Sequence, residues 1–454
     1  MDTRANQPPT TREYDDAPLR LFHIRVATSS SGGAFSDGYG LGIIGIALSG
    51  ATSQLSLTPV WIGLLGGASL AGLFAGALLT GPAADRYGRR PIFVYNMVIL
   101  AVLSALQLFV HSGAQLLVLR VAIGFLLGTD YVVNKALLIE FTPRRVRGRI
   151  MGLLSVAWAG GYACAYAVGF ALAGRDSESW RWMLLSSAVP CLLVLPLRVT
   201  LPESPLWLVN HGLGAAAAAV VRAKFGAGVA LPHSTPAAQT HHGRWRRLFA
   251  PALRRYTLVA CIFFTCLVIP YFAVGTFVSQ VMSAMHLKSN YVGGLIYNVG
   301  LLVGAIVGLL VVDRLTRRTV VIGSLGLAAV IMLILSASTL PAVVMIVLFA
   351  AFAFLLSTAS NLVYVYVPEL FPTDLRASGI GLAIASSRIG SAISTFLLPI
   401  IVDAYGIRTA LAACVAVLAL GAALCQRWAP ETSHLPLGAL DDLAMAHSQG
   451  EHPA

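Results

Sequence analysis

Among the charged residues inside long apolar stretches of the sequence, four could carry protons or hold an anion. They are Asp37, Asp130, Lys135 and Arg388. A charged side chain at the centre of a lipid-facing helix costs about 2.5–3.5 kcal/mol, so each of them needs a partner or a polar cavity. A buried carboxyl group that is stable when protonated can take up and release a proton. We therefore predict that Asp37 and Asp130 are proton-coupling residues, with Asp37 as the first candidate.

The two cations predict a site for an organic anion. Arginine keeps its charge at any relevant pH and can bind a carboxylate through two parallel hydrogen bonds. Lys135 and Arg388 are therefore predicted to hold the carboxylate of a substrate. Further polar and aromatic residues of the apolar stretches are predicted to line the same cavity and together suit an aromatic or small hydrophobic acid. They are Tyr39, Tyr271, Tyr297, Asn298, Asn361 and Tyr364.

Each charge also has a structural interpretation, which the sequence leaves open. Asp37 could be paired permanently with a cation of the fourth apolar stretch, and Arg388 could be paired with Glu369. Lys135 is only about six residues from the end of its stretch, so its long side chain could reach water. Asp130 and Lys135 are about 140° apart around a helix, so we expect them to face different neighbours.

The elements that must position these residues are membrane-spanning helices. The chain of 454 residues is 57% hydrophobic and only 11% charged, whereas soluble domains carry about 25% charged residues. Apolar runs long enough to cross a bilayer, about 20 residues each, form two groups of six on either side of a polar interval. They lie at 27–50, 59–81, 91–110, 116–141, 150–173, 182–200, 257–285, 289–312, 319–338, 341–367, 378–402 and 408–427.

We therefore predict an all-α membrane protein with 12 transmembrane helices in two pseudo-symmetric six-helix bundles. The bundles would occupy residues 27–200 and 257–427, joined by a cytoplasmic linker at 201–256 and flanked by cytoplasmic tails at 1–26 and 428–454. The six cysteines lie in apolar runs without the spacing of a disulfide or zinc framework, so no metal is expected.

The basic residues predict an orientation in the membrane. The net charge is +12, and 24 of the 31 Lys and Arg residues fall in loops on one side, against four on the other. Positive residues are enriched on the cytoplasmic side, so both termini and the central linker are predicted to be cytoplasmic in a cell or inner membrane. We expect a monomer in the lipid bilayer and no nucleic-acid partner.

Three motifs occur twice at nearly the same offset, about 228 residues. The repeated pairs begin at Asp85 and Asp313, at Glu140 and Glu369, and at Pro202 and Pro430. Three repeats in the same order and at the same spacing predict a duplicated six-helix unit. Parallel repeats of this kind occur in secondary transporters, whose substrate site lies between the repeats near the membrane midplane.

Charged residues of these motifs are predicted to form a conformational latch. An acid at a helix end can accept charge-assisted hydrogen bonds from arginines of neighbouring loops, and arginines can cap helix C-termini. Such contacts would hold the two halves together on the cytoplasmic side, or alternatively the arginines only set the orientation. The predicted latch residues are Asp85, Arg86, Arg89, Glu140, Arg147, Asp313, Arg314, Glu369 and Arg376.

At these motifs the chain resembles the major facilitator superfamily over essentially its whole length. The run from Gly81 to Arg90 matches the superfamily signature between helices 2 and 3, and Pro202-Glu-Ser-Pro-x-Trp-Leu resembles the sugar-porter and metabolite:proton symporter branches. The first-helix run Phe35-Ser-Asp-Gly-Tyr and the fourth-helix run Gly128-Thr-Asp-Tyr are similar to motifs of organic-acid and aromatic-acid symporters. The related first-helix motif often carries a second acid where this chain has Gly40.

The resemblance implies a secondary active transporter that moves a small organic acid, with aromatic acids among the candidates, by proton symport and alternating access. It implies that the proton gradient is the energy source, and it implies no cofactor and no enzymatic activity. The alternatives are a drug or metabolite exporter, a sugar or polyol:proton symporter, and a non-transporting membrane sensor. The seventh apolar stretch lacks the paired glutamines expected of a sugar porter, which argues against a sugar.

Overall fold

The structure is a computed structural model that describes residues 12–226, 228–232, 247–251, 253–285, 290–311, 315–338, 340–372 and 375–432, without the side chains of residues 290, 364 and 377. The regular secondary structure of these ranges is helical, apart from one isolated bridge between Arg12 and Val229. Eleven helical stretches of the described chain are long and apolar enough to cross a membrane. The predicted all-α fold is confirmed.

The N-terminal half, α1–α7, follows the first six predicted spans. Its elements are η1 (Tyr14–Asp16), α1 (Leu21–Gln54), α2 (Pro59–Tyr87), α3 (Arg89–Leu106), η2 (Gln107–Phe109), α4 (Gly113–Phe141), α5 (Arg144–Leu172), α6 (Ser179–Ser186) and α7 (Ala188–Val199). Two short helices follow it, α8 (Pro205–Asn210) and α9 (Gly214–Lys224). The sixth predicted span is divided at Ser187 into α6 and α7.

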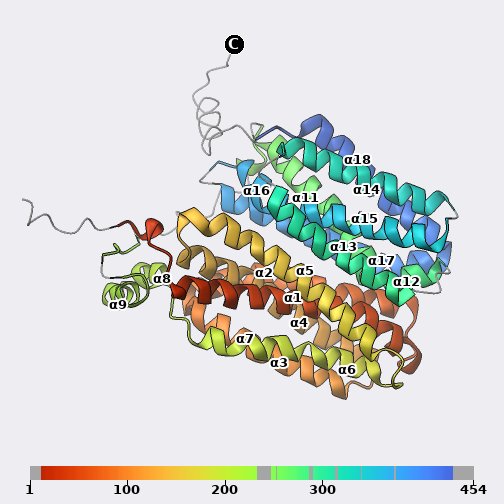
Figure 1. The fold of residues 1–454 in the computed structure, drawn as a ribbon, viewed down its shortest axis with the longest axis horizontal. Helices are drawn as coiled ribbons and strands as arrows, with labels where there is room; N and C mark the ends of the chain where they lie inside the picture. Colours follow the sequence, from red (N-terminus) through yellow and green to blue (C-terminus); the bar gives the residue numbers. More distant parts are fainter. Residues whose placement is uncertain are drawn as a thin grey trace, which may run out of the picture.

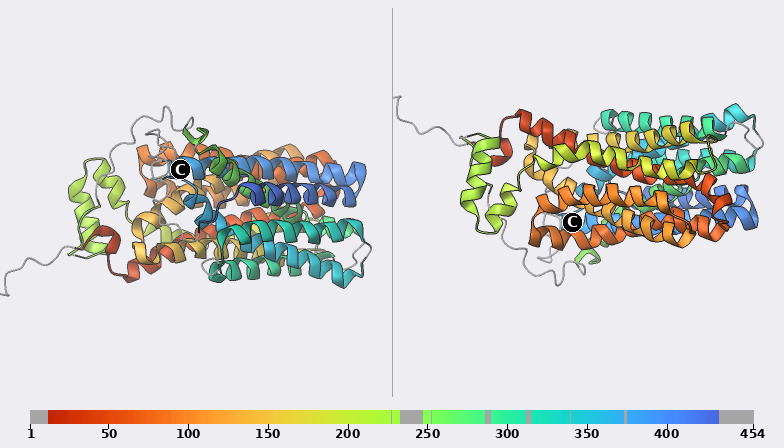
Figure 2. Two further views of the ribbon diagram at one scale, coloured as in Figure 1. Left: turned by 90° about the horizontal axis from the view of Figure 1, so that it is seen from above. Right: turned by 90° about the horizontal axis from the view of Figure 1, so that it is seen from below.

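The C-terminal half, α11–α18, follows the other six predicted spans. Its helices are α11 (Arg254–Thr276), α12 (Val278–Ala284), α13 (Asn290–Val311), α14 (Arg317–Ala337), α15 (Ala342–Ser360), α16 (Leu362–Glu369), α17 (Arg376–Tyr405) and α18 (Ile407–Trp428). The long helices of both halves run along the longest axis of the molecule, side by side (Figure 1). Helices α8 and α9 lie outside the bundles at one end (Figures 1 and 2).

Helix α1 stands at the place of the first predicted span, although it is not among the eleven most apolar stretches. Its middle, from Gly32 to Gly45, is rich in glycine and almost entirely buried. Small residues let helix backbones approach closely: a Cβ atom on Gly38 would lie 2.0 Å from the carbonyl oxygen of Trp158 in α5. The low hydropathy of α1 therefore reflects its place inside the protein, away from lipid.

Backbone contacts also join the two halves. A Cβ atom on Gly45 of α1 would lie 1.7 Å from the carbonyl oxygen of Thr276 in α11. A Cβ atom on Gly63 of α2 would lie 2.2 Å from the carbonyl oxygen of Phe396 in α17. Both contacts lie toward the end of the molecule opposite α8 and α9 (Figure 1). At these points only glycine leaves room for the other half.

The duplicated motifs form the same network in each half, at the end that carries α8 and α9. Glu203 accepts hydrogen bonds from the backbone amides of Arg89 and Arg90, at 3.1 Å each, and so caps the N-terminus of α3. Arg89 forms a salt bridge with Glu140, which also accepts a hydrogen bond from Ser204. We call this end of the molecule, with its two networks, the charged end.

The C-terminal half repeats these contacts about 228 residues later. Glu431 accepts hydrogen bonds from the backbone amides of Arg317 and Arg318, at 3.1 Å each, at the N-terminus of α14. Arg317 lies 3.7 Å from Glu369, and Thr432 donates a hydrogen bond of 2.6 Å to Glu369. The predicted duplication therefore extends to individual hydrogen bonds.

The predicted latch residues are bound within their own halves. Asp85 lies 3.5 Å from Arg89, Arg147 binds Asp15 at 2.7 Å, and Arg376 donates a hydrogen bond to the carbonyl oxygen of Pro368. Arg86 is placed over the ring of Tyr87. Asp313 and Arg314 lie outside the described residues. A latch between the halves stays a prediction for another conformation, because the contacts just described join parts of one half.

Candidate functional site

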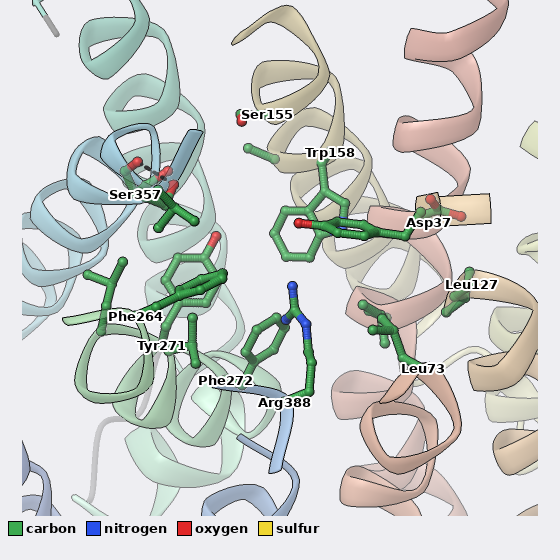
Figure 3. A pocket seen from close by; sticks show the side chains of 17 residues that line it. Asp37, Leu73, Leu127, Ser155, Trp158, Phe264, Tyr271, Phe272, Ser357 and Arg388 are labelled. Carbon is green, nitrogen blue, oxygen red and sulfur yellow. Dashed lines mark hydrogen bonds between the residues drawn. The ribbon is translucent and has the colours of Figure 1, made fainter. Parts of the chain in front are cut away.

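A pocket lies between the two halves, about midway along the long helices (Figure 3). It is lined from the N-terminal half by α1, α2, α4 and α5, and from the C-terminal half by α11, α15, α16 and α17. Its lining is largely apolar and aromatic, with a few polar groups that include Asp37, Arg388, Ser155 and Ser357. This combination is typical of sites that bind small molecules.

Arg388 of α17 points its guanidinium group into this pocket (Figure 3). The group is 7% exposed and lies 5.5–5.9 Å from the ring centres of Tyr131, Phe264 and Phe272. Its Nε atom has no hydrogen-bond partner, and among the described residues no carboxylate lies within 4.0 Å of it. The alternative pairing with Glu369 is not formed, because that acid binds Thr432 at the charged end.

Aromatic rings from both halves line the part of the pocket next to Arg388. Trp158 of α5 lies 6.1 Å from Tyr271 and 6.1 Å from Phe272 of α11, between ring centres. Tyr271, a predicted binding residue that lines the pocket, lies 5.3 Å from Phe272. Rings prefer offset or edge-to-face contacts at such distances. The pocket therefore offers flat apolar walls drawn from both halves.

Asp37 of α1 lines the pocket on the side of the N-terminal half (Figure 3). Its side chain is 5% exposed, and its Oδ1 atom has no hydrogen-bond partner in the described part of the chain. The neighbouring Gly38 keeps α1 in contact with α5 at Trp158. The structure thus places a nearly buried carboxyl group at a site that a small molecule can reach.

Asp130 does not line the pocket, although we predicted it as a second proton carrier. It forms a fully buried salt bridge with Arg198 of α7, in which Nη2 lies 2.9 Å from Oδ2. Asn96 and Asn134 also place amide nitrogens 3.5 and 3.4 Å from its oxygens. Arg198 is one of the 24 basic residues that the charge count places in loops on the cytoplasmic side, and this placement is wrong because its side chain is completely buried.

Lys135 lies beside the pocket. Its Nζ atom is 3.2 Å from the ring centre of Tyr131, a pocket residue. The expectation that Asp130 and Lys135 face different neighbours agrees with this geometry. A direct contact of Lys135 with a substrate stays a prediction.

Several of the other predicted binding residues make contacts inside the helix bundles. Tyr39 shares a hydrogen bond of 2.8 Å with Ser186 of α6. Tyr297 is fully buried, Asn298 donates to the carbonyl oxygen of Gly294, and Asn361 donates to the carbonyl oxygen of Ala305. The side chain of Tyr364 lies outside the described part of the chain. Among those members of the group whose side chains the structure describes, only Tyr271 is part of the pocket.

Comparison with known proteins places the chain in a family. The model of the family described as "Sugar (and other) transporter" matches residues 26–443. The chain belongs to this transporter family. It is 38% identical over 433 residues to the inner membrane metabolite transport protein YgcS of Escherichia coli, which covers 95% of this chain and 97% of that protein. It is 26% identical to the niacin transporter NiaP of Acinetobacter baylyi, over 83% of this chain and 86% of that one.

The fold of this family member is also similar to a solved structure. The inward-open xylose transporter XylE of E. coli matches with a TM-score of 0.77 and 20% identity, over 93% of this chain and 99% of that one. The resemblance to the major facilitator superfamily is therefore confirmed. The protein is a multi-pass membrane transporter, as the apolar spans and the duplicated halves predicted.

Several pocket residues of this transporter were not found from the sequence. Trp158, Phe264, Phe272 and Tyr131 lie in apolar stretches, where a residue that lines a pocket has the same pattern as one that packs in the core. Arg198 stands at the end of an apolar span, where an arginine commonly places its charged group in water, so its burial was not predicted. The helix register needed to pair it with Asp130 is not visible in the sequence.

Proposed function

We propose that this transporter moves a small aromatic or similarly flat hydrophobic carboxylic acid together with a proton, by alternating access of a central site. The observation that carries the proposal is the position of Asp37 and Arg388, which line one pocket from opposite halves. Arg388 would bind the substrate carboxylate, and Trp158, Tyr271 and Phe272 would contact its apolar face. Because the two halves both contribute, rocking of the halves would release the substrate.

Arg388 supports an anion over a sugar as substrate. A buried guanidinium group keeps its charge, and burying an unpaired charge is costly. A carboxylate ligand would supply the missing partner through charge-assisted hydrogen bonds. The name of the relative NiaP is consistent with this choice, since niacin is an aromatic carboxylic acid.

Asp37 supports coupling to protons. A carboxyl group in a low-dielectric site favours its neutral form, while the pocket gives it access to water on one side of the membrane at a time. Symport follows if Asp37 must be protonated before the loaded transporter can change conformation. The proton gradient would then be the energy source, with no bound cofactor, and the protein would act as a monomer with both termini in the cytoplasm.

The test is uptake into proteoliposomes that contain the purified full chain. Labelled aromatic acids, aliphatic acids of similar size and sugars are compared, with and without an inward proton gradient. Accumulation of an aromatic acid only when the gradient is present supports the proposal. Gradient-driven accumulation of a sugar instead, or outward movement of several unrelated compounds, would replace it with a sugar symporter or an exporter.

A further inference from the structure

The salt bridge between Asp130 and Arg198 lies directly behind α1. Both side chains are fully buried, and both terminal nitrogens of the arginine bind the two carboxylate oxygens. Arg198 also donates a hydrogen bond of 2.9 Å to the carbonyl oxygen of Phe93 and stacks on that ring. Two charge-assisted hydrogen bonds join the carboxylate to the guanidinium group, so Asp130 provides the negative charge of a buried ion pair.

Gly33 lets α1 lie against this salt bridge. A Cβ atom on Gly33 would be 1.9 Å from the Nη2 atom of Arg198 and 2.9 Å from the Oδ2 atom of Asp130. Asp37 follows Gly33 by one helical turn and therefore lies on the same face. Helix side chains lean toward the N-terminus of their helix, which directs Asp37 toward the pair. The carboxyl group of Asp37 is therefore directed toward the carboxylate of Asp130.

This arrangement places two carboxyl groups beside one guanidinium group. Neighbouring carboxylates resist double ionisation, and Arg198 fixes the negative charge on Asp130. The buried Oδ1 atom of Asp37 has no partner among the described residues. A protonated Asp37 can donate a hydrogen bond to the Asp130 carboxylate, whereas an ionised Asp37 cannot.

Three other titratable or charged groups face Asp37. Lys135 comes from α4 and Cys191 from α7, and Arg388 lines the opposite side of the same pocket from α17. The two cations can offset the negative charge that forms when Asp37 releases its proton to water in the pocket. A substrate carboxylate on Arg388 would remove part of this compensation. Binding of the anion would therefore favour a protonated Asp37.

We propose that Arg198 is a positioning residue for proton coupling, which keeps Asp130 ionised beside Asp37 so that the two acids together bind a single proton, on Asp37. This inference rests on the proposed function, in which Asp37 exchanges the coupled proton. It assigns separate roles to the two intramembrane acids: Asp130 is a fixed charge, and Asp37 changes its protonation state.

The test is an infrared pH titration of the purified full chain, which needs no substrate. The carboxylic-acid C=O band that is lost in Asp37→Asn reports the protonation of Asp37. In Asp130→Asn, the positive charge of Arg198 is unopposed, so the midpoint of this band should fall by about 1–3 pH units. In Arg198→Gln, the negative charge of Asp130 is unopposed, so the midpoint should rise by a similar amount. Arg198→Lys keeps the charge and should stay close to wild type.

Opposite shifts support the inference, and shifts in the same direction or no shift overturn it, because a merely structural role has no reason to depend on the sign of the removed charge. If Arg198→Gln does not fold, the double variant Asp130→Asn/Arg198→Gln has no uncompensated charge and replaces it. Its midpoint must be higher than that of Asp130→Asn alone, and an equal or lower value overturns the inference. If no band of the wild type depends on Asp37, the proton site of the proposed function fails as well.

Discussion

Asp37 and Arg388 lie on opposite sides of one pocket, the acid on a helix of the N-terminal half and the arginine on a helix of the C-terminal half. In the described part of the chain, no salt bridge joins these two residues. A carboxyl group and a guanidinium group that line the same pocket without forming an ion pair leave room for a ligand between them. The two residues can therefore be tested separately, one for the proton and one for the anion.

Replacing Asp37 by asparagine should uncouple transport from protons. Asparagine has nearly the same shape but cannot bind or release a proton. We expect Asp37→Asn to lose accumulation driven by a proton gradient while it still exchanges labelled for unlabelled substrate across the membrane. Uptake and counterflow in proteoliposomes measure the two activities. The exposed Asp176 provides the control Asp176→Asn, and wild-type accumulation by Asp37→Asn would refute the role of Asp37.

Replacing Arg388 by lysine should weaken substrate binding. Lysine keeps the charge but loses the planar pair of donors that fits a carboxylate. We expect the half-saturation concentration for the acid to rise about tenfold, which corresponds to about 1.4 kcal/mol of binding free energy. Initial rates of uptake over a range of concentrations measure it. Arg408, exposed at the start of α18, gives the control Arg408→Lys, and an unchanged half-saturation value would make Arg388 a structural residue.

Removing the carboxylate of Glu203 should destabilise the protein without changing substrate affinity. This side chain caps the N-terminus of α3, and loss of such a cap costs about 0.5–2 kcal/mol. We expect Glu203→Ala to lower the Tm in detergent and to leave the half-saturation concentration unchanged. Glu178, which is 56% exposed, provides the control Glu178→Ala with little effect. A changed affinity with a normal Tm would place Glu203 in the transport cycle instead.

Acidification should loosen the contacts around His23, in the first turn of α1 before the predicted span. Burial lowers the pKa of the His23 imidazole, whose Nδ1 atom accepts a hydrogen bond from the backbone amide of Arg20. The folded state thus binds fewer protons there than the unfolded state, so the free energy of unfolding falls as the pH drops below about 6.5.

Thermal unfolding at about pH 8 and about pH 5.5 tests this expectation. The Tm of the wild type should fall further on acidification than that of His23→Gln, which cannot gain a proton. An equal fall in both proteins would show that His23 makes no contribution.

The spans and the duplication could be predicted because each rests on a property of the chain itself. Apolar length decides which segments cross a membrane, and the repeats at Glu140 and Glu369 lead to matching bonds with Ser204 and Thr432. The breaks within spans were not predicted. Helices α6 and α7, for example, continue one apolar run with only Ser187 between them, and hydropathy carries no sign of this interruption.

The candidate site was predicted only in part. Asp37, Arg388 and Tyr271 were found because charge or polarity inside an apolar helix is unusual. The salt bridge of Asp130 was missed because its partner is on α7, and pairing across helices depends on rotation and tilt, which packing decides. Trp158 and Phe272 were missed for a different reason, since large apolar residues are favourable both against lipid and against a ligand.

The contacts of Gly45 with Thr276 and of Gly63 with Phe396 have a practical consequence. At each of them a single added methyl group would act as a wedge between the halves, at a distance from the residues that bind substrate and proton. Alanine at either position is therefore a means to shift the population toward the conformation in which this end is open. Such a variant would provide a trapped form for inhibitor screening or for structure determination of the opposite state.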